Sequence, residues 1–175
     1  MKVSNKLNLG SGNVVLPGYT NLDSVALPSV DIIHDLDVYP WPIKDNTYEE
    51  VFCDNVLEHL SSIIKPMEEL WRITKPGGKI VIRVPIFPGI GAAADPTHKQ
   101  FYCYTTFNYF RPEDNLNYYS KARFKILKRR ITFPKFMGFW TWFFNLHINL
   151  QKGWHTWLSF LIPGYFLEVE LETLK

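Results

Sequence analysis

The chain has 175 residues, of which 46% are hydrophobic and 21% are charged. A domain of this length buries roughly 70% of the surface that its unfolded form exposes, so its core needs no metal ion or disulfide. The net charge of +2 is too small to indicate nucleic-acid binding, which normally shows as a concentrated basic surface. Cys53 and Cys103 match no CxxC spacing, and residues 1–5 hold no apolar run typical of a signal peptide. We therefore expect a cytoplasmic protein with a single domain over residues 1–175 and with both thiols buried or inert.

Short strands are predicted in the first part of the chain. Residues 6–9 form the first strand, which ends in the glycine turn LNLGSG. Residues 19–22 and 31–33 are further strand candidates, and they end near Asp23 and Asp35. Acidic side chains at strand ends suit a ligand-binding edge.

A fourth strand, a helix and a fifth strand follow in the middle of the chain. Residues 50–53 are predicted as a strand, and residues 56–74 have the apolar spacing of a helix that KPGG then stops. Residues 79–84 form the fifth strand. This alternation indicates a mostly parallel sheet, in which ligands sit at the carboxyl ends of strands near a topological switch point.

After Pro85 the pattern changes to a loop and then to DPTHKQFYCYTTFNYF, which we interpret as an insertion on the substrate side. Its aromatic residues could line an acceptor pocket or belong to the core: Tyr102, Tyr104 and Phe107. Residues 122–132 and 165–173 alternate apolar and polar side chains and are predicted as two late strands.

An aromatic insertion of about residues 133–164 separates the two late strands. Polar residues interrupt it too often for a bilayer span, which needs about 20 consecutive mainly apolar residues. Three roles stay open: covering the sheet or forming a homodimer surface, touching a membrane surface as a peripheral contact, or receiving an apolar substrate. Its tryptophans mark the first place to look for an interface: Trp140, Trp142, Trp154 and Trp157.

The glycine turn argues against a dinucleotide cofactor. Dinucleotide-binding enzymes carry three glycines at this turn, whereas here Gly10 and Gly12 are followed by Val15 at the third position. Residues 13–18 also leave little room for a pyrophosphate-binding helix. We therefore expect no NAD binding and a ligand without phosphates.

Four motifs cover residues 6–85 in chain order: LNLGSG, GYTNLD, HDLDVYPWPIKDNTYEEVFCDNVLEHL and ELWRITKPGGKIVIRVP. Together they resemble the class I S-adenosylmethionine-dependent methyltransferases, specifically the small-molecule branch called type 11. The resemblance implies an α/β fold with a Rossmann-like, mostly parallel seven-stranded sheet flanked by helices and with an antiparallel C-terminal strand. It also implies S-adenosyl-L-methionine as the cofactor.

The resemblance assigns the first cofactor contacts to the glycine turn and the second strand. Gly10 and Gly12 would let the backbone approach the methionine part of the cofactor, and Asp23 would bind both ribose hydroxyls, since a carboxylate can accept two hydrogen bonds. The alternative for Asp23 is a solvated turn acid. One departure from the family pattern is that the first helix is shortened to a loop and the helices that usually cover the cofactor are missing, which favours weak cofactor binding or a partner.

Further contacts are assigned to the ends of the third and fourth strands. Asp35 and Leu36 would bind the adenine, although Asp35, which Asp37 follows, has the alternative of a solvated acid. Asp54 and Asn55 would lie beneath the sulfonium. No metal-binding set is predicted.

Methyl transfer from a sulfonium depends mainly on positioning, but a hydroxyl acceptor benefits from a general base. His98 follows the fifth strand, where the family builds its acceptor pocket, so it is the candidate catalytic residue; the alternative is a histidine that only bonds its own loop. His59 is interpreted as a packing or capping residue.

Three functions compete. The leading one is methylation of a small-molecule or glycan acceptor, at oxygen. The second is nucleic-acid methylation through the basic residues at 121–130, but DNVL at 54–57 lacks the Asp/Asn-Pro-Pro-aromatic motif of base methylases, and the basic run is interpreted as a solvated strand face. The third is a non-catalytic S-adenosylmethionine-binding or scaffold subunit.

Overall fold

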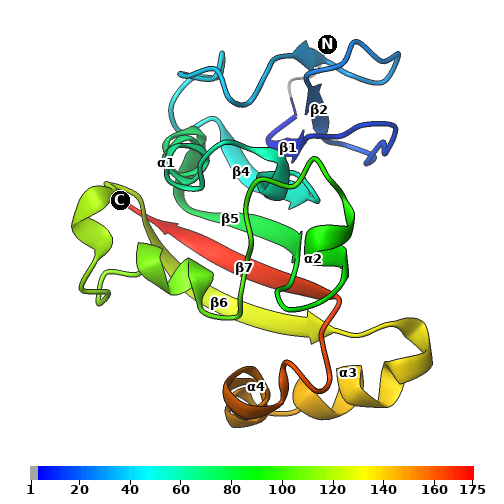
Figure 1. Ribbon diagram of the computed structural model, residues 1–175. Helices are drawn as coiled ribbons and strands as arrows, with labels where there is room; N and C mark the ends of the chain where they lie inside the picture. The colour runs from blue at the N-terminus through cyan, green and yellow to red at the C-terminus, as the bar shows by residue number, and fades with distance from the viewer. Residues whose placement is uncertain (1–3) are drawn as a thin grey trace.

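The computed structural model describes residues 4–175, which build one seven-stranded sheet of order β3-β2-β1-β4-β5-β7-β6 (Figure 1). The strands are β1 (Lys6–Leu9), β2 (Thr20–Asp23), β3 (Ile32–Ile33), β4 (Tyr48–Asp54), β5 (Thr74–Pro85), β6 (Arg123–Thr132) and β7 (Phe166–Leu174). Strands β1 to β5 pair in parallel, and β7 is antiparallel to both β5 and β6. The predicted fold class is confirmed, and the strand order reverses between β1 and β4, which makes their carboxyl ends the switch point.

The predicted fifth strand is too short. The KPGG turn ends the helix as expected, but the chain is already extended at Thr74, which pairs with Tyr48 of β4. A register shift follows before Glu50 pairs with Lys79. Strand β5 therefore has 12 residues.

The predicted helix over residues 56–74 is divided in two. A 3-10 helix η1 (Leu57–His59) and an α-helix α1 (Ile64–Ile73) are separated by a short irregular segment. Pro66 lies in the first turn of α1, where proline is tolerated, but its ring would clash with the carbonyl of residue 62 if the helix continued upstream. The single-helix prediction is therefore wrong at its N-terminal half.

One face of the sheet carries the core. Side chains of α1 are fully buried against the apolar residues of β1, β4 and β5, among them Met67, Leu70 and Ile73. The 3-10 helix η2 (Thr106–Phe110) continues this layer over β6, where the ring of Phe110 contacts Phe124 at 6.3 Å between centroids. From the sequence, two roles stayed open for Tyr102, Tyr104 and Phe107, an acceptor pocket or the core. All three are buried in this core.

The opposite face is polar and crossed by ion pairs. Glu170 of β7 lies 2.9 Å from the Nζ of Lys79 and 3.7 Å from that of Lys128, while Arg130 approaches Glu168 at 3.4 Å. Figure 1 shows loops instead of helices between β1 and β2 and between β2 and β3. In the described part of the chain this face therefore has no helical layer, in agreement with the expected shortening of the first helix.

The aromatic insertion follows β6 and packs along the edge of the sheet as α3 (Gly138–Phe144), α4 (Ile148–Gly153) and a π-helical turn (Trp154–Leu158) (Figure 1). Phe133, Phe144 and Trp154 are buried together, whereas Trp157 is 80% exposed. Among residues 4–175 no helix is long and apolar enough to cross a membrane. The extent of the domain, residues 1–175, stays a prediction.

Candidate active site

A pocket of about 230 Å³ opens at the carboxyl ends of β1, β2 and β4 and is lined by Gly10, Asp23, Ser24, Asp35, Leu36, Asn55, Val56, His59 and Leu60. It lies at the switch point, where open α/β sheets bind ligands. Five of the residues predicted to bind the cofactor are among those that line it. Gly12 and Asp54, also predicted, do not line it.

The glycine turn forms one wall of the pocket. Gly10 has a φ of 63°, and a Cβ built on it would overlap the methyl groups of Val56. Glycine is therefore required for both its backbone conformation and its close approach to Val56. Gly12 also has a positive φ, of 50°, but a Cβ there would meet open space.

Asp23 connects the turn to the end of β2. Its Oδ2 accepts a hydrogen bond from the Gly12 amide at 2.8 Å, and its Oδ1 accepts one from the Val25 amide at 3.0 Å. Oδ1 also accepts a long hydrogen bond from the Ser24 hydroxyl at 3.5 Å. A carboxylate has about four lone-pair sites, so Oδ2 can accept one further donor from the pocket. Asp23 is thus structural as well as available to a ligand, which the sequence alone did not indicate.

The wall formed by Asp35 and Leu36 is held by its neighbour Asp37. Asp37 accepts hydrogen bonds from the amide and hydroxyl of Ser61 and from Lys99. Burial acts to raise the pKa of Asp37, but these bonds outweigh it and hold the pKa below its usual value. Asp37 therefore fastens this wall to the segments that carry the histidines.

Asp54 and Asn55 have separate positions at the end of β4. Asp54 lies beside the Nε of Arg83 on β5, outside the pocket, because side chains alternate between the two faces of a strand. Asn55 has a φ of 53°, lines the pocket and donates from Nδ2 to Asp54 Oδ1 at 3.1 Å. Asp54 therefore reaches the pocket only through Asn55.

Glu58, His59 and His98 lie together beside the pocket. Each offers one possible ligand atom, and these atoms lie within 4.8 Å of one another. His59 lines the pocket, and His98 contacts it with 4.8 Å between ring centroids. The Glu58 carbonyl accepts from the amides of Lys99 and Gln100 at 2.7 and 3.1 Å, so two segments far apart in sequence hold this cluster.

The hydrogen bonds of both histidines indicate which ring nitrogen is free. The Nδ1 of His98 lies 3.1 Å from the Ala92 carbonyl oxygen, which can only accept, so Nδ1 carries a proton and, in the neutral imidazole, Nε2 has the lone pair. Thr97 Oγ1 donates to Asp95 Oδ1 at 2.6 Å and lies 2.9 Å from His59 Nδ1. The hydroxyl therefore accepts from His59, whose Nε2 is left with a lone pair.

Glu58 is the residue that sequence reasoning missed. Its side chain is 1% exposed, and neither carboxylate oxygen has a hydrogen-bond partner among the described residues. Burial raises the pKa of Glu58 to about 7, whereas burial and the charge of His98 lower the pKa of His59. In the sequence Glu58 is one acid in VLEHL, and only its position beside two histidines distinguishes it.

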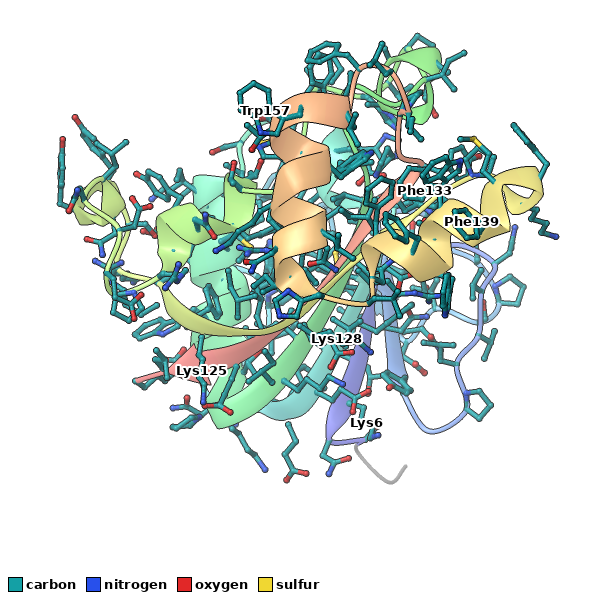
Figure 2. The ribbon with its side chains drawn as sticks, turned by 90° about the horizontal axis from the view of Figure 1, so that it is seen from below. Lys6, Lys125, Lys128, Phe133, Phe139 and Trp157 are labelled. Atoms are coloured by element: carbon teal, nitrogen blue, oxygen red, sulfur yellow. The ribbon has the colours of Figure 1, made fainter. Side chains whose placement is uncertain are left out.

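Two side chains of the basic run near residue 125 take part in ion pairs across the sheet. Lys128 and Arg130 are exposed on the polar face of the sheet and are paired with Glu170 and Glu168. Figure 2 shows Lys125 and Lys128 apart from the aromatic side chains of the insertion. These ion pairs support the interpretation of the run as a solvated strand face.

Comparisons with known proteins agree with the site. The model of the type 11 methyltransferase domain matches residues 20–82, from β2 through most of β5. A demethylmenaquinone methyltransferase from Bacillus mycoides is 28% identical over 71 residues, which are 41% of this chain and 30% of that protein. An uncharacterised protein from Methanocaldococcus jannaschii is 46% identical over 43 residues, 25% of this chain and 19% of that protein. The matches thus span less than a third of either relative.

Solved structures extend the likeness to the whole fold. A methyltransferase from Archaeoglobus fulgidus, described as dependent on S-adenosylmethionine, has a TM-score of 0.64 and covers 98% of this chain and 86% of its own at 14% identity. Identity this low shows the fold alone. The chain thus matches the type 11 methyltransferase domain over residues 20–82, and over nearly its whole length it has the fold of a methyltransferase that depends on S-adenosylmethionine.

Proposed function

We propose that this protein transfers a methyl group from S-adenosylmethionine to an oxygen of a small-molecule or glycan acceptor. The observation that carries this proposal is the cluster of Glu58, His59 and His98 directly against the pocket, because removing or aligning a hydroxyl proton needs such groups. S-adenosylmethionine is the cofactor of the family. The open acceptor site on Asp23 Oδ2 and the missing Cβ of Gly10 fit a ribose and a closely approaching chain.

The cofactor contacts follow the ends of the strands. Gly10 and Gly12 face the methionine part, and Asp23 takes the ribose hydroxyls. Asp35 and Leu36 bind the adenine. Asn55, supported by Asp54, lies beneath the sulfonium.

The chemical step needs little covalent help from the protein. The acceptor oxygen forms a bond to the methyl carbon, and the carbon–sulfur bond breaks with its electron pair returning to sulfur. Alignment of the two supplies much of the acceleration. His98 either accepts the hydroxyl proton or orients the hydroxyl, and the free lone pair on its Nε2 supports both roles.

Aromatic rings beside the ligand edge support an acceptor with apolar faces. The Phe87 ring lies 6.0 Å from the rings of Phe101 and Phe160, between centroids, and all three are exposed. Apolar small molecules and the apolar faces of sugars both stack on such rings, so this observation supports both acceptor classes. Nucleic acid is not proposed as an acceptor.

The surface of the insertion supports two partner proposals. Phe136, Trp157 and Phe160 are each more than three-quarters exposed, which favours a homodimer contact or a peripheral membrane contact. The two free thiols, Cys53 and Cys103, support a cytoplasmic location. Cys53 is buried and Cys103 is half-buried, and that Cys103 is inert stays a prediction.

Turnover by a His98→Ala variant tests the proposal. A panel of sugars and hydroxylated small molecules is first screened with labelled S-adenosylmethionine. With the acceptor found, His98→Ala should lower the methylation rate by about 10²- to 10⁴-fold while its affinity for S-adenosylhomocysteine stays near wild type. His155→Ala, which removes a half-buried histidine beside Tyr104, is the control. Normal turnover by His98→Ala would contradict the assigned role, and cofactor binding without any product would favour the scaffold alternative.

A further inference from the structure

The cluster beside the pocket has the composition of a metal site. Glu58 and His59 come from η1, and His98 comes from the loop after α2 (Gly91–Ala94). Two imidazole nitrogens and one carboxylate oxygen are a ligand set that catalytic zinc uses, with the fourth position left open for water or substrate.

The neighbours of both histidines orient them as metal ligands are oriented. A histidine that binds a metal usually donates its other ring N–H to a carbonyl or to a carboxylate system. His98 donates from Nδ1 to the Ala92 carbonyl, and His59 donates to Thr97, which is itself bonded to Asp95. Among the described residues neither Nε2 makes a hydrogen bond, and Asp95 Oδ2 lies 4.0 Å from the Nε2 of His98.

Glu58 supplies an independent observation. Its buried carboxyl has no hydrogen-bond partner and no ion pair among residues 4–175, and leaving such a group unsatisfied is unfavourable by roughly 1–3 kcal/mol or more. A cation held between this carboxylate and two neutral imidazoles would satisfy it. Packing alone gives no reason for an acid at this position.

The three possible ligand atoms lie slightly farther apart than in a zinc site. Zinc bonds of about 2.0–2.2 Å in a tetrahedral arrangement hold ligand atoms about 3.4 Å apart. The three ligand atoms here lie within 4.8 Å of one another, so the widest pair would close by about 1.4 Å. His98 lies on a loop, which can follow such a change.

We propose that Glu58, His59 and His98 bind a divalent cation of the zinc class, and that its open position takes the acceptor's hydroxyl. Its role in turnover rests on the proposed function, whereas the binding itself does not. A coordinated hydroxyl loses its proton to solvent more readily, and its oxygen then attacks the methyl carbon without any change in the metal's oxidation state. His98 thereby orients the acceptor through the cation instead of taking the proton.

Cobalt is the probe, because it replaces zinc and absorbs visible light. The full chain is stripped with a chelator, dialysed and titrated with Co²⁺, and a Zn²⁺ titration by calorimetry follows. We expect saturable binding of one ion per chain. Glu58→Gln and His59→Ala should abolish the cobalt spectrum. Thr97→Val, which removes the hydroxyl that connects His59 to Asp95, should weaken affinity by about 10- to 100-fold. His155→Ala should bind as wild type.

The outcomes separate this inference from the proposed function. S-adenosylhomocysteine is titrated into the same metal-free protein, and circular dichroism confirms that each variant is folded. No saturable cobalt or zinc binding by wild type, or equal binding by folded Glu58→Gln and His59→Ala, would overturn the metal site, even where S-adenosylhomocysteine binds normally. Metal binding without any S-adenosylhomocysteine binding would instead contradict the proposed function.

Discussion

At the scale of single residues, Asp23 combines support of the glycine turn with an expected ribose contact. Asp23→Ala removes the acceptors for the Gly12 and Val25 amides and both expected ribose bonds. We expect S-adenosylhomocysteine binding to weaken by about 2 to 4 kcal/mol, from the range for hydrogen bonds to charged groups, as measured by calorimetry. Asp23→Asn keeps acceptor oxygen at one position and should lose less. Unchanged affinity in a folded Asp23→Ala variant would remove this residue from the site.

Gly10 and Gly12 form a matched pair of probes. Alanine at either position takes a left-handed backbone, at about 1–2 kcal/mol, but only at Gly10 does the new Cβ also overlap Val56. Gly10→Ala should therefore lower the free energy of unfolding more than Gly12→Ala in urea titrations. The Gly10→Ala/Val56→Ala double variant should lose less free energy of unfolding than the sum of the losses of the two single variants, because the smaller side chain removes the overlap. Equal losses for the two glycines would show that the overlap relaxes freely.

Glu58 shows how far single residues could be predicted. Carboxyl ends of parallel strands meet at one edge, so the strand pattern could place Gly10, Asp23, Asp35 and Asn55 near one another. The position of Glu58 depends instead on a short 3-10 helix meeting a loop from residues 95–100. Contacts of that kind leave no periodic signal in the sequence.

At the scale of elements, the insertion combines a buried and an exposed tryptophan on consecutive turns. Trp154 is fully buried against Phe133 and Phe144, and Trp157 is 80% exposed. Trp154→Ala should lower the free energy of unfolding by about 3–5 kcal/mol, and Trp157→Ala should change it little. Denaturant unfolding of both variants checks this contrast. Similar losses would mean that the exposed ring is covered, as a homodimer contact would cover it.

The charged sheet face makes stability depend on pH. The hydrogen bond from Lys79 lowers the pKa of Glu170, and that from Tyr19 lowers the pKa of Glu50. The unfolded pKa of a glutamate is about 4.3–4.5. A carboxyl whose folded pKa is lower than this value stabilises the fold fully at a pH above the unfolded pKa. This contribution is lost as the pH falls through the folded pKa. For such surface pairs the contribution is about 0.2–1 kcal/mol each.

Glu170→Gln should therefore destabilise the protein at about pH 7 but leave it nearly as stable as wild type at about pH 3. Urea titrations at both pH values measure the difference. A loss of the same size at both would show that Glu170 stabilises the sheet through packing and not through its charge.

At the scale of the whole molecule, the alternation of apolar and charged residues along the strands allowed the sheet and its solvated face to be predicted. FLEVELETL in β7 alternates apolar and charged residues, which is typical of a sheet with one solvated face, and YEEVFCD in β4 carries charge as well. The strands were therefore predictable to within one or two residues, apart from the start of β5. The division of the helix follows from the local steric effect of Pro66, which the apolar spacing alone does not show. The packing of the insertion depends on tertiary contacts that no local pattern specifies.

Binding of S-adenosylhomocysteine, measured by calorimetry on the full chain with NAD⁺ as the comparison, tests the central claim most directly. The pocket has a carboxylate for the ribose and a glycine turn without the third glycine or the helix that a pyrophosphate requires. We predict saturable binding of one S-adenosylhomocysteine per chain and no heat from NAD⁺. Binding of NAD⁺ with no response to S-adenosylhomocysteine would contradict the account.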